Sequence, residues 1–155
     1  MKDLAPEVPP EDLARKDWMG RVAKAPAGRV AALLDACGAC PDFTWLRRPE
    51  IGSVMVRGRA GGTGAPFNLG EMTVTRCALK LADGTVGHAY IQGRRTDDAE
   101  AAALVDALMQ TDRAPDIRAA VLEPLGAEMS GAKAARAAKA AATKVDFFTM
   151  VRGDD

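Results

Sequence analysis

The chain has little of what enzymes use for acid–base and nucleophilic catalysis. Its 155 residues include a single histidine, His88, and only three cysteines. No serine or cysteine lies in a nucleophile elbow, so the sequence shows no catalytic triad. No pair of carboxylates is placed to share the acid and base roles. These absences favour a non-catalytic or auxiliary domain, and we assign no catalytic residue from the sequence.

Net charge, long apolar runs and a disulfide framework are also missing. Lysine plus arginine equals aspartate plus glutamate at 21 each, so no overall field attracts nucleic acid or an acidic membrane. The apolar runs fall far short of the roughly 20 residues that span a bilayer, and residues 1–10 contain no signal-peptide core. An odd number of cysteines does not suggest paired disulfides. We therefore expect a cytoplasmic protein without a nucleic-acid or membrane partner.

What is present fits one α+β domain. A hydrophobic content of 48% is enough for one core in a chain of this length. Three prolines interrupt residues 1–10, which predicts a flexible tail there and a single domain over residues 11–155. In that domain we expect an antiparallel sheet with a central Asp-Gly hairpin, an N-terminal helical hairpin, a middle helix, an alanine-rich C-terminal helix and a terminal strand.

Apolar spacing predicts an N-terminal helical hairpin. The first helix starts near residue 11, carries an apolar stripe that runs from Ala14 to Trp18 and beyond, and is expected to end at Pro26. The second helix follows Pro26, with Gly38 as the left-handed residue after its end. The high helix propensity of alanine predicts a last helix over residues 127–144.

The middle of the chain carries its own helix signals. Asp97 and Glu100 have the spacing of a capping box, in which each side chain bonds a backbone amide at the start of a helix predicted over residues 98–110. Pro115 is expected to open a further short helical turn, which Pro124 would stop.

Segments rich in β-branched and aromatic residues are predicted to be strands: residues 42–46, 52–59, 71–81, 85–92 and the terminal 145–152. Four glycines and Pro66 argue against regular structure over residues 60–70. Asp83-Gly84 is a strong hairpin signal and predicts a two-residue type I′ turn with positive φ at both positions. The strands on its two sides should therefore pair with each other.

The expected turn fixes a register in which the numbers of paired residues sum to 167. Cys77 would then pair with Tyr90, and Arg76 with Ile91. In this register both faces of the sheet are largely apolar. His88 lies on the same face as Cys77, and Arg76 lies among apolar residues on the opposite face. A sheet covered on one side by its own helices then needs further helices or a partner subunit on the other side.

Arg76 is the sharpest single signal in this sheet. An unpaired guanidinium is too costly to bury, so Arg76 needs an acid or an anion. Glu71, Glu100 or a carboxylate of a partner would serve. The plainer interpretation, that Arg76 lies at the surface with its stem along the sheet, is about as strong.

A glycine-rich loop flanked by arginines forms the candidate interface or anion-binding region. Several backbone amides beside arginines suit an anion, but the loop lacks the Gly-Lys-Ser/Thr ending of a P-loop and leads into a strand. A structural or interface loop is therefore the favoured interpretation. The candidate residues, including the turn after the hairpin and the terminal strand, are Arg57, Arg59, Gly61, Gly62, Gly64, Arg76, Gln92, Gly93, Arg94, Phe147, Phe148 and Arg152.

Cys37 and Cys40 have the spacing of a metal knuckle or a redox pair. Only Cys77 and His88 could complete a Cys3His zinc site with them, and no second Cys-x-x-Cys exists. Ordinary thiols at a helix end are the favoured interpretation. We expect no metal or cofactor bound by this chain, and a zinc or redox module is the weaker alternative.

Several motifs together resemble one family over about residues 17–154. They are Gly61-Gly62-Thr63-Gly64, Thr73-x-Thr75-Arg76, Leu81-x-Asp83-Gly84-Thr85-x-Gly87, Gln92-Gly93-Arg94, Ala103-Leu104-x-Asp106-Ala107-Leu108 and the ending that runs from Val145 to Asp154. The chain is similar to the PhnG family, the G subunit of the bacterial carbon-phosphorus lyase system. It departs from the family pattern at Arg95-Thr96-Asp97-Asp98, and its Cys37-x-x-Cys40 pair matches no family signature.

The resemblance implies a subunit of a cytoplasmic core complex with the H, I and J subunits. With MgATP and an alkylphosphonate as substrates, that system replaces adenine to form ribose 1-phosphonate 5-triphosphate. Its chemistry is associated with the I and J subunits, while the G subunit is required without being known as an active-site donor. We expect a scaffold that docks on the I subunit through the hairpin, the glycine loop and the terminal strand. The alternative is a subunit whose arginines grip the triphosphate or the phosphonate directly.

Overall fold

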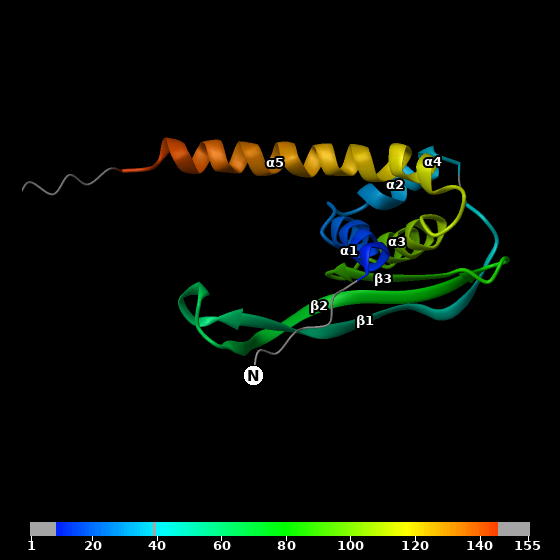
Figure 1. The fold of residues 1–155 in the computed structure, drawn as a ribbon, viewed down its shortest axis with the longest axis horizontal. Coiled ribbons are helices and arrows are strands. Elements are labelled where there is room, and N and C mark those ends of the chain that lie inside the picture. The colour runs from blue at the N-terminus through cyan, green and yellow to red at the C-terminus, as the bar shows by residue number, and fades with distance from the viewer. Residues whose placement is uncertain (1–8, 39, 146–155) are drawn as a thin grey trace, which may run out of the picture.

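The fold is a layer of helices on one face of a three-stranded sheet (Figure 1). It is seen in a computed structural model, which describes residues 9–38 and 40–145. The sheet is antiparallel with strand order β1-β2-β3. Its strands are β1 (Phe43–Arg59), β2 (Pro66–Leu81) and β3 (Val86–Gln92). The predicted α+β class with a central hairpin is confirmed.

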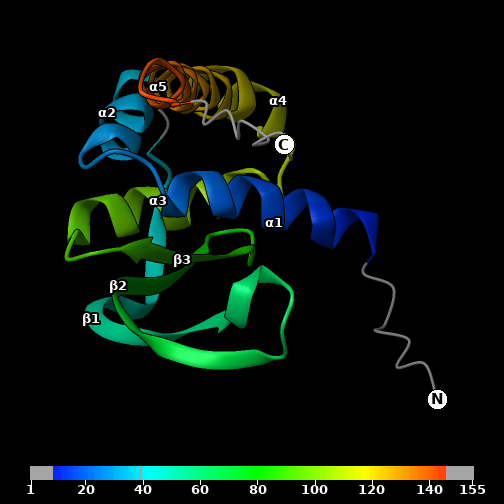
Figure 2. The same ribbon diagram turned by 90° about the vertical axis from the view of Figure 1, so that its left-hand side faces the viewer.

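The helices stack above the sheet in two tiers (Figure 2). They are α1 (Pro10–Ala23), α2 (Arg29–Ala36), α3 (Thr96–Leu108), α4 (Ala114–Ile117) and α5 (Glu123–Ala142), with a π-helical turn, η2 (Arg118–Leu122), between the last two. The helix α3 packs directly on β3 and β2, and α1 lies beside it. The two N-terminal helices both contact α3. None of the described helices combines the length and the apolar character needed to cross a membrane.

The core lies between α3 and the sheet and depends on small residues. Leu104, Val105 and Leu108 are buried, as predicted, together with a run of alanines on the same helix. Gly87 of β3 lies directly beneath α3, where an added Cβ would run into the carbonyl oxygen of Ala103 and come within 2.8 Å of the Ala107 Cβ. The absence of a side chain at Gly87 therefore lets the helix backbone approach the strand.

A buried carboxylate joins α1, α3 and the edge of β3. Asp106 on α3 is fully buried and accepts hydrogen bonds from Trp18 Nε1 at 2.9 Å and from Arg15 Nη2 at 2.7 Å. It also accepts one from the backbone N–H of His88 at 2.9 Å. The nearby Val86 carbonyl accepts a hydrogen bond from Gln110 Nε2 at 2.9 Å. Side chains of the helices thus close part of the free edge of β3.

The first strand is longer than predicted, because the segments predicted as separate strands, 42–46 and 52–59, are joined in one continuous strand, β1. β1 runs without a break from residue 43 to 59, and register shifts lie on both sides of Arg47. These irregularities accommodate the stretch that contains Pro49. β1 is an edge strand, where a proline without an N–H is tolerated. The predicted loop over residues 60–70 is also shorter, since β2 begins at Pro66 after a 3-10 turn at Ala60–Gly62.

The predicted hairpin register is wrong by one residue. Gly84 has a positive φ of 91°, but Asp83 does not, and Leu81 N donates to Thr85 O. The connection is therefore a three-residue loop, which Asp83 stabilises by accepting a hydrogen bond from Thr85 N at 2.8 Å. The numbers of paired residues sum to 166 rather than 167.

The slip of one residue turns every side chain of β3 to the opposite face. Cys77 pairs with Ala89, and Arg76 pairs with Tyr90. Ala89 and Ile91 are consequently buried beneath the helices, whereas His88 and Tyr90 are exposed on the other face of the sheet. That outer face is more polar than the sequence predicted.

The predicted capping box is also wrong. α3 starts at Thr96, its N-cap residue is Arg95, and no side chain caps it. Asp98 is buried and accepts a hydrogen bond from Gly28 N at 2.8 Å, so it serves the start of α2 instead of its own helix. A contact between two helices is thus formed by Asp98, in place of the capping contacts within α3 that the spacing of Asp97 and Glu100 suggested.

Pro124 does not stop the helix as predicted. It lies in the first turn of α5 and follows the π-helical turn, where the altered hydrogen-bond pattern accommodates a residue without an N–H. The alanine-rich helix is confirmed, and every residue from 131 to 142 is exposed.

The structure describes only part of the predicted N-terminal tail and of the predicted C-terminal strand. Pro10 already belongs to α1, and Trp18 is buried as predicted while Ala14 is exposed. Residues 1–8 of the predicted tail and residues 146–152 of the predicted terminal strand lie outside the described residues.

We predict that Gly87→Ala lowers the free energy of unfolding by about 2 to 3 kcal/mol, because the new methyl group meets the backbone of α3. Urea denaturation measures this loss. Gly70→Ala is the matched control, since a methyl group added at Gly70 would have no other atom within 4 Å, and its effect should stay below about 1 kcal/mol. Equal effects of the two substitutions would contradict the tight packing at Gly87.

Asp106→Asn is expected to destabilise the fold by about 3 kcal/mol, because it leaves Arg15 without its carboxylate and weakens the contact to the His88 amide. Thermal and urea unfolding of the variant give this value. The same substitution at the exposed Asp112 controls for the loss of one charge. A loss below about 1 kcal/mol at Asp106 would show that this network is dispensable.

Candidate interaction surface

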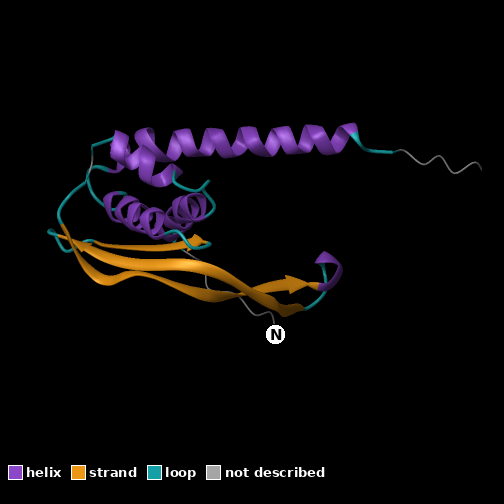
Figure 3. Ribbon diagram, turned by 180° about the vertical axis from the view of Figure 1, so that it is seen from behind, coloured by secondary structure: helices purple, strands orange, loops and turns teal. Residues whose placement is uncertain are grey.

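A two-stranded arm extends from the body of the protein (Figure 3). β3 pairs with β2 only as far as Val74, opposite Gln92. Beyond that pair, β1 and β2 continue together from Ser53 and Thr73 to Arg59 and Pro66. We call residues 53–73 the arm. It is about 20 Å long at the usual rise of a strand, and its two strands have no third strand beside them.

The arm exposes large apolar side chains. Phe67 is 44% exposed, Met55 52% and Leu69 66%. Phe67 and Leu69 both lie against Gly58 on one face of the ribbon. Ile51, at the base of the arm, is also exposed. A cluster of exposed apolar side chains on an isolated ribbon is typical of an interaction surface.

The glycine loop at the tip of the arm is folded against itself. Gly61 and Gly62 have positive φ values of 60° and 79°. A Cβ at Gly64 would lie 2.8 Å from the Ala60 carbonyl oxygen, so this turn requires glycine there. Arg59 Nη1 donates to the Gly64 carbonyl at 3.0 Å. One of the candidate arginines is therefore engaged by the loop itself.

Arg76 finds its acid within the chain, on the neighbouring strand. Its Nε donates to Glu50 Oε1 at 2.7 Å, and its guanidinium lies over Gly52. The acid is thus Glu50, not Glu71 or Glu100. The sequence conceals this acid because residues 47–51 suggest a break between two strands, whereas Glu50 in fact lies within β1 and pairs with Arg76. Glu71 instead accepts a hydrogen bond from Ser53 at 3.2 Å.

The structure does not bring the three candidate arginines together. Arg57 is exposed and pairs with Asn68, near the tip of the arm. Asn68 and Arg76 are eight residues apart on β2, which is about 26 Å along an extended strand. Arg57 and Arg59 lie near the tip of the arm, whereas Arg76 lies beyond its base, where β3 also pairs with β2.

The turn after β3 is bonded to the base of the arm, and Arg95, which follows it, donates to the Ala25 carbonyl after α1 at 2.7 Å. Gly93, with φ of 85°, donates its N–H to Thr73 O and accepts a hydrogen bond from Thr75 Oγ1 at 2.7 Å. Arg95 bonds the Gln92 carbonyl at 2.9 Å. Arg94, the next candidate, is exposed. The candidates Phe147, Phe148 and Arg152 lie outside the described residues.

The structure does not bring together the four side chains considered for a zinc site, which are Cys37, Cys40, Cys77 and His88. Cys77 is buried beneath α3, and its thiol donates to the Ala99 carbonyl at 3.0 Å. His88 is exposed on the other face of the sheet. Burial, helped by the charge of Glu100, raises the pKa of the Cys77 thiol to about 12. Among the residues that the structure describes, no group of three histidine, cysteine or acidic side chains could hold a metal ion.

Fold and surface together define a two-layer α+β domain with a projecting β-ribbon arm. The chain matches the family model described as "Phosphonate metabolism protein PhnG" over residues 13–153. It is 42% identical over 141 residues to the alpha-D-ribose 1-methylphosphonate 5-triphosphate synthase subunit PhnG of Rhizobium meliloti (strain 1021). That alignment covers 91% of this chain and 90% of the relative.

The chain belongs to the PhnG family. The match covers both layers of the fold and the whole arm, so these features lie within the family region. The family resemblance that the sequence motifs indicated is thereby confirmed.

The raised pKa of Cys77 generates a prediction about its reactivity. At pH 8 the Cys77 thiol should stay protonated and shielded, so iodoacetamide should alkylate the exposed Cys40 and spare Cys77 in the folded protein. Peptide mass spectrometry reads the modified positions, and alkylation in urea, where all three thiols react, is the control. Alkylation of Cys77 as fast as Cys40 in the native protein would contradict its burial.

Proposed function

We propose that this chain is the G subunit of an alpha-D-ribose 1-methylphosphonate 5-triphosphate synthase and that it acts as a non-catalytic scaffold. The observation that carries this proposal is the 42% identity to the subunit of that name over nine tenths of both chains. The complex would use MgATP and methylphosphonate as substrates and release adenine. It would assemble in the cytoplasm with the H and I subunits and with the J subunit of the larger core.

The roles of the charged side chains support a scaffold more than a catalyst. Asp106 and Asp98 are buried and engaged in holding helices together. Arg76 is paired with Glu50, and Arg59 is bonded to its own loop. If the candidate arginines bound a triphosphate directly, Arg76 would have to leave Glu50 and Arg59 would have to leave the Gly64 carbonyl. This alternative therefore has less support, and no cofactor is proposed for this subunit.

The arm is the part of the chain that we assign to docking on the I subunit. Its apolar side chains are exposed, and β1 presents an unpaired edge along 17 residues. An open strand edge beside exposed apolar groups favours pairing with another chain. The glycine loop at the tip would permit close approach of the partner backbone.

Co-expression with the I subunit from the same organism tests the docking. The wild-type chain should elute with the I subunit on a sizing column at micromolar concentration. Phe67→Asp combined with Leu69→Asp should weaken binding by about 100-fold, because two apolar anchors are replaced by charges. Leu13→Asp is the matched control, since Leu13 is also exposed but lies on α1, away from the arm.

Clean separation of the wild-type chain from the I subunit would contradict pairwise docking. Calorimetry with MgATP tests the alternative function. The scaffold proposal predicts no binding heat with the isolated chain, under conditions where the assembled complex does bind. A stoichiometric signal that Arg57→Ala abolishes would favour direct triphosphate binding instead.

A further inference from the structure

Two segments without support from the rest of the fold project from the same side of the body. One is the arm, and the other is the part of α5 over residues 131–142, in which every residue is exposed. Figure 1 shows both segments extending in the same direction, and Figure 2 shows α5 and the arm at opposite margins of the molecule. We call this pair of segments the fork.

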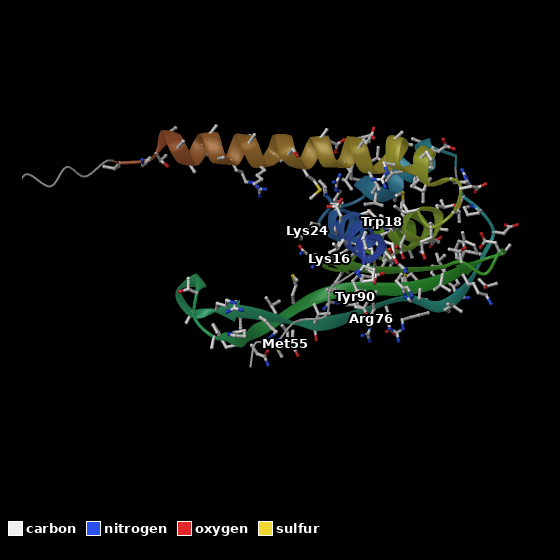
Figure 4. The ribbon with its side chains drawn as sticks, in the orientation of Figure 1. Lys16, Trp18, Lys24, Met55, Arg76 and Tyr90 are labelled. Carbon is white, nitrogen blue, oxygen red and sulfur yellow. The ribbon has the colours of Figure 1, made fainter. Side chains whose placement is uncertain are left out.

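The root of the fork on the α5 side is a cationic cleft. Lys133 and Arg136 of α5 and Lys24, which follows α1, line an open cleft of about 690 Å³ together with Pro26 and Met129. Figure 4 shows Lys24 at the end of the helical layer from which the fork extends. Cations from the two ends of the described chain thus converge on one surface.

The acid in this lining is already neutralised. Glu128 forms an ion pair with Arg29, whose Nε lies 2.9 Å from Glu128 Oε2. The hydrogen bond from Arg29 lowers the pKa of Glu128, so the carboxylate stays ionised and committed to that pair. Lys24, Lys133 and Arg136 therefore provide the uncompensated charge of the cleft.

The cationic stripe continues along α5 without an acid. Lys133, Arg136 and Lys139 follow one another at intervals of three residues, and no aspartate or glutamate occurs from residue 129 to 145. Like charges at this spacing repel one another and weaken a helix. Acidic groups supplied by another molecule would turn that repulsion into attraction.

The lining favours a polypeptide over a nucleotide as the occupant. None of the residues around the cleft is aromatic, so a base has no ring on which to stack. Lys133 and Arg136 lie on the side of α5, where the backbone amides already bond within the helix and are not free to hold a phosphate. Met129 and Arg136 in the lining are of residue types that are enriched at protein–protein interfaces.

We propose that the fork receives an acidic segment of a partner subunit, whose carboxylates pair with Lys24, Lys133 and Arg136. This inference rests on the proposed function, because the partner is taken to be another subunit of the synthase. It adds the chemical character of that partner and a second contact surface, on α5, to the docking assigned to the arm.

Carbodiimide cross-linking of the assembled complex tests the chemistry of the contact. The reagent joins a lysine amine to a carboxylate that touches it, with the water lost from the new amide taken up by the carbodiimide. Lys24 and Lys133 should be linked to aspartate or glutamate residues of a partner subunit, as read by mass spectrometry. Links confined to this chain, or none from either lysine, would overturn the proposal.

Charge reversal provides the quantitative test. Lys133→Glu combined with Arg136→Glu should weaken assembly at least about tenfold at low salt, and the difference should shrink as salt is added. The milder double substitution, Lys133→Gln with Arg136→Gln, should weaken assembly less, because it removes the positive charges without adding negative ones. Lys80→Glu with Arg118→Glu, two exposed cations outside the fork, is the matched control. Circular dichroism should show unchanged helix content in all three.

The outcomes separate this inference from the proposed function. A wild-type complex that forms and is equally stable after charge reversal would overturn the acidic partner segment alone. Failure of the wild-type chain to form any complex would overturn both. Binding of ATP by the isolated chain that charge reversal abolishes would make the cleft a nucleotide site and would also overturn the proposal.

Discussion

The structure depends on one buried carboxylate more than on any other polar group. Asp106 receives hydrogen bonds from Arg15, from Trp18 and from the backbone of His88, which belong to two other elements. A buried charge is tolerated only when its hydrogen-bonding capacity is used, and here three partners use it. The same network positions α1 and α3 over the edge of β3. It thereby decides which edge of the sheet is closed and which is left open.

The open parts of the molecule follow from that arrangement. Helix side chains cover β3 at its edge, while β1 forms the opposite edge and continues into the arm. The helices that pack directly on the sheet, α3 and α1, are shorter than the first two strands, so the arm extends past them and Phe67 and Leu69 stay exposed. The exposed part of α5, residues 131–142, extends on the same side and consists of Gly131, alanines and three basic residues. A chain that leaves both segments uncovered is suited to be one piece of a larger assembly.

Periodicity and turn signals predicted most elements of the fold, because helices and hairpins are specified locally. The failures arose where tertiary contacts decide. Asp83-Gly84 suggested a two-residue turn, yet the three-residue loop shifted the register and exchanged the faces of Ala89 and Tyr90. Asp97 and Glu100 have the spacing of a capping box, yet no side chain caps α3, and the neighbouring Asp98 accepts a hydrogen bond from the start of α2. The partner of Arg76 was hidden because Pro49 appeared to end a strand. The motifs identified the family, although they could not place Lys24 beside α5.

Hydrogen–deuterium exchange of the chain, free and in complex with its partner subunits, tests whether the arm is the docking element. We expect that amides of the arm, residues 53–73, exchange rapidly in the free chain and become protected on assembly. Amides of α3 should be protected in both states, because that helix is already buried. An arm that exchanges equally fast in the free chain and in the complex would contradict its role as the docking element.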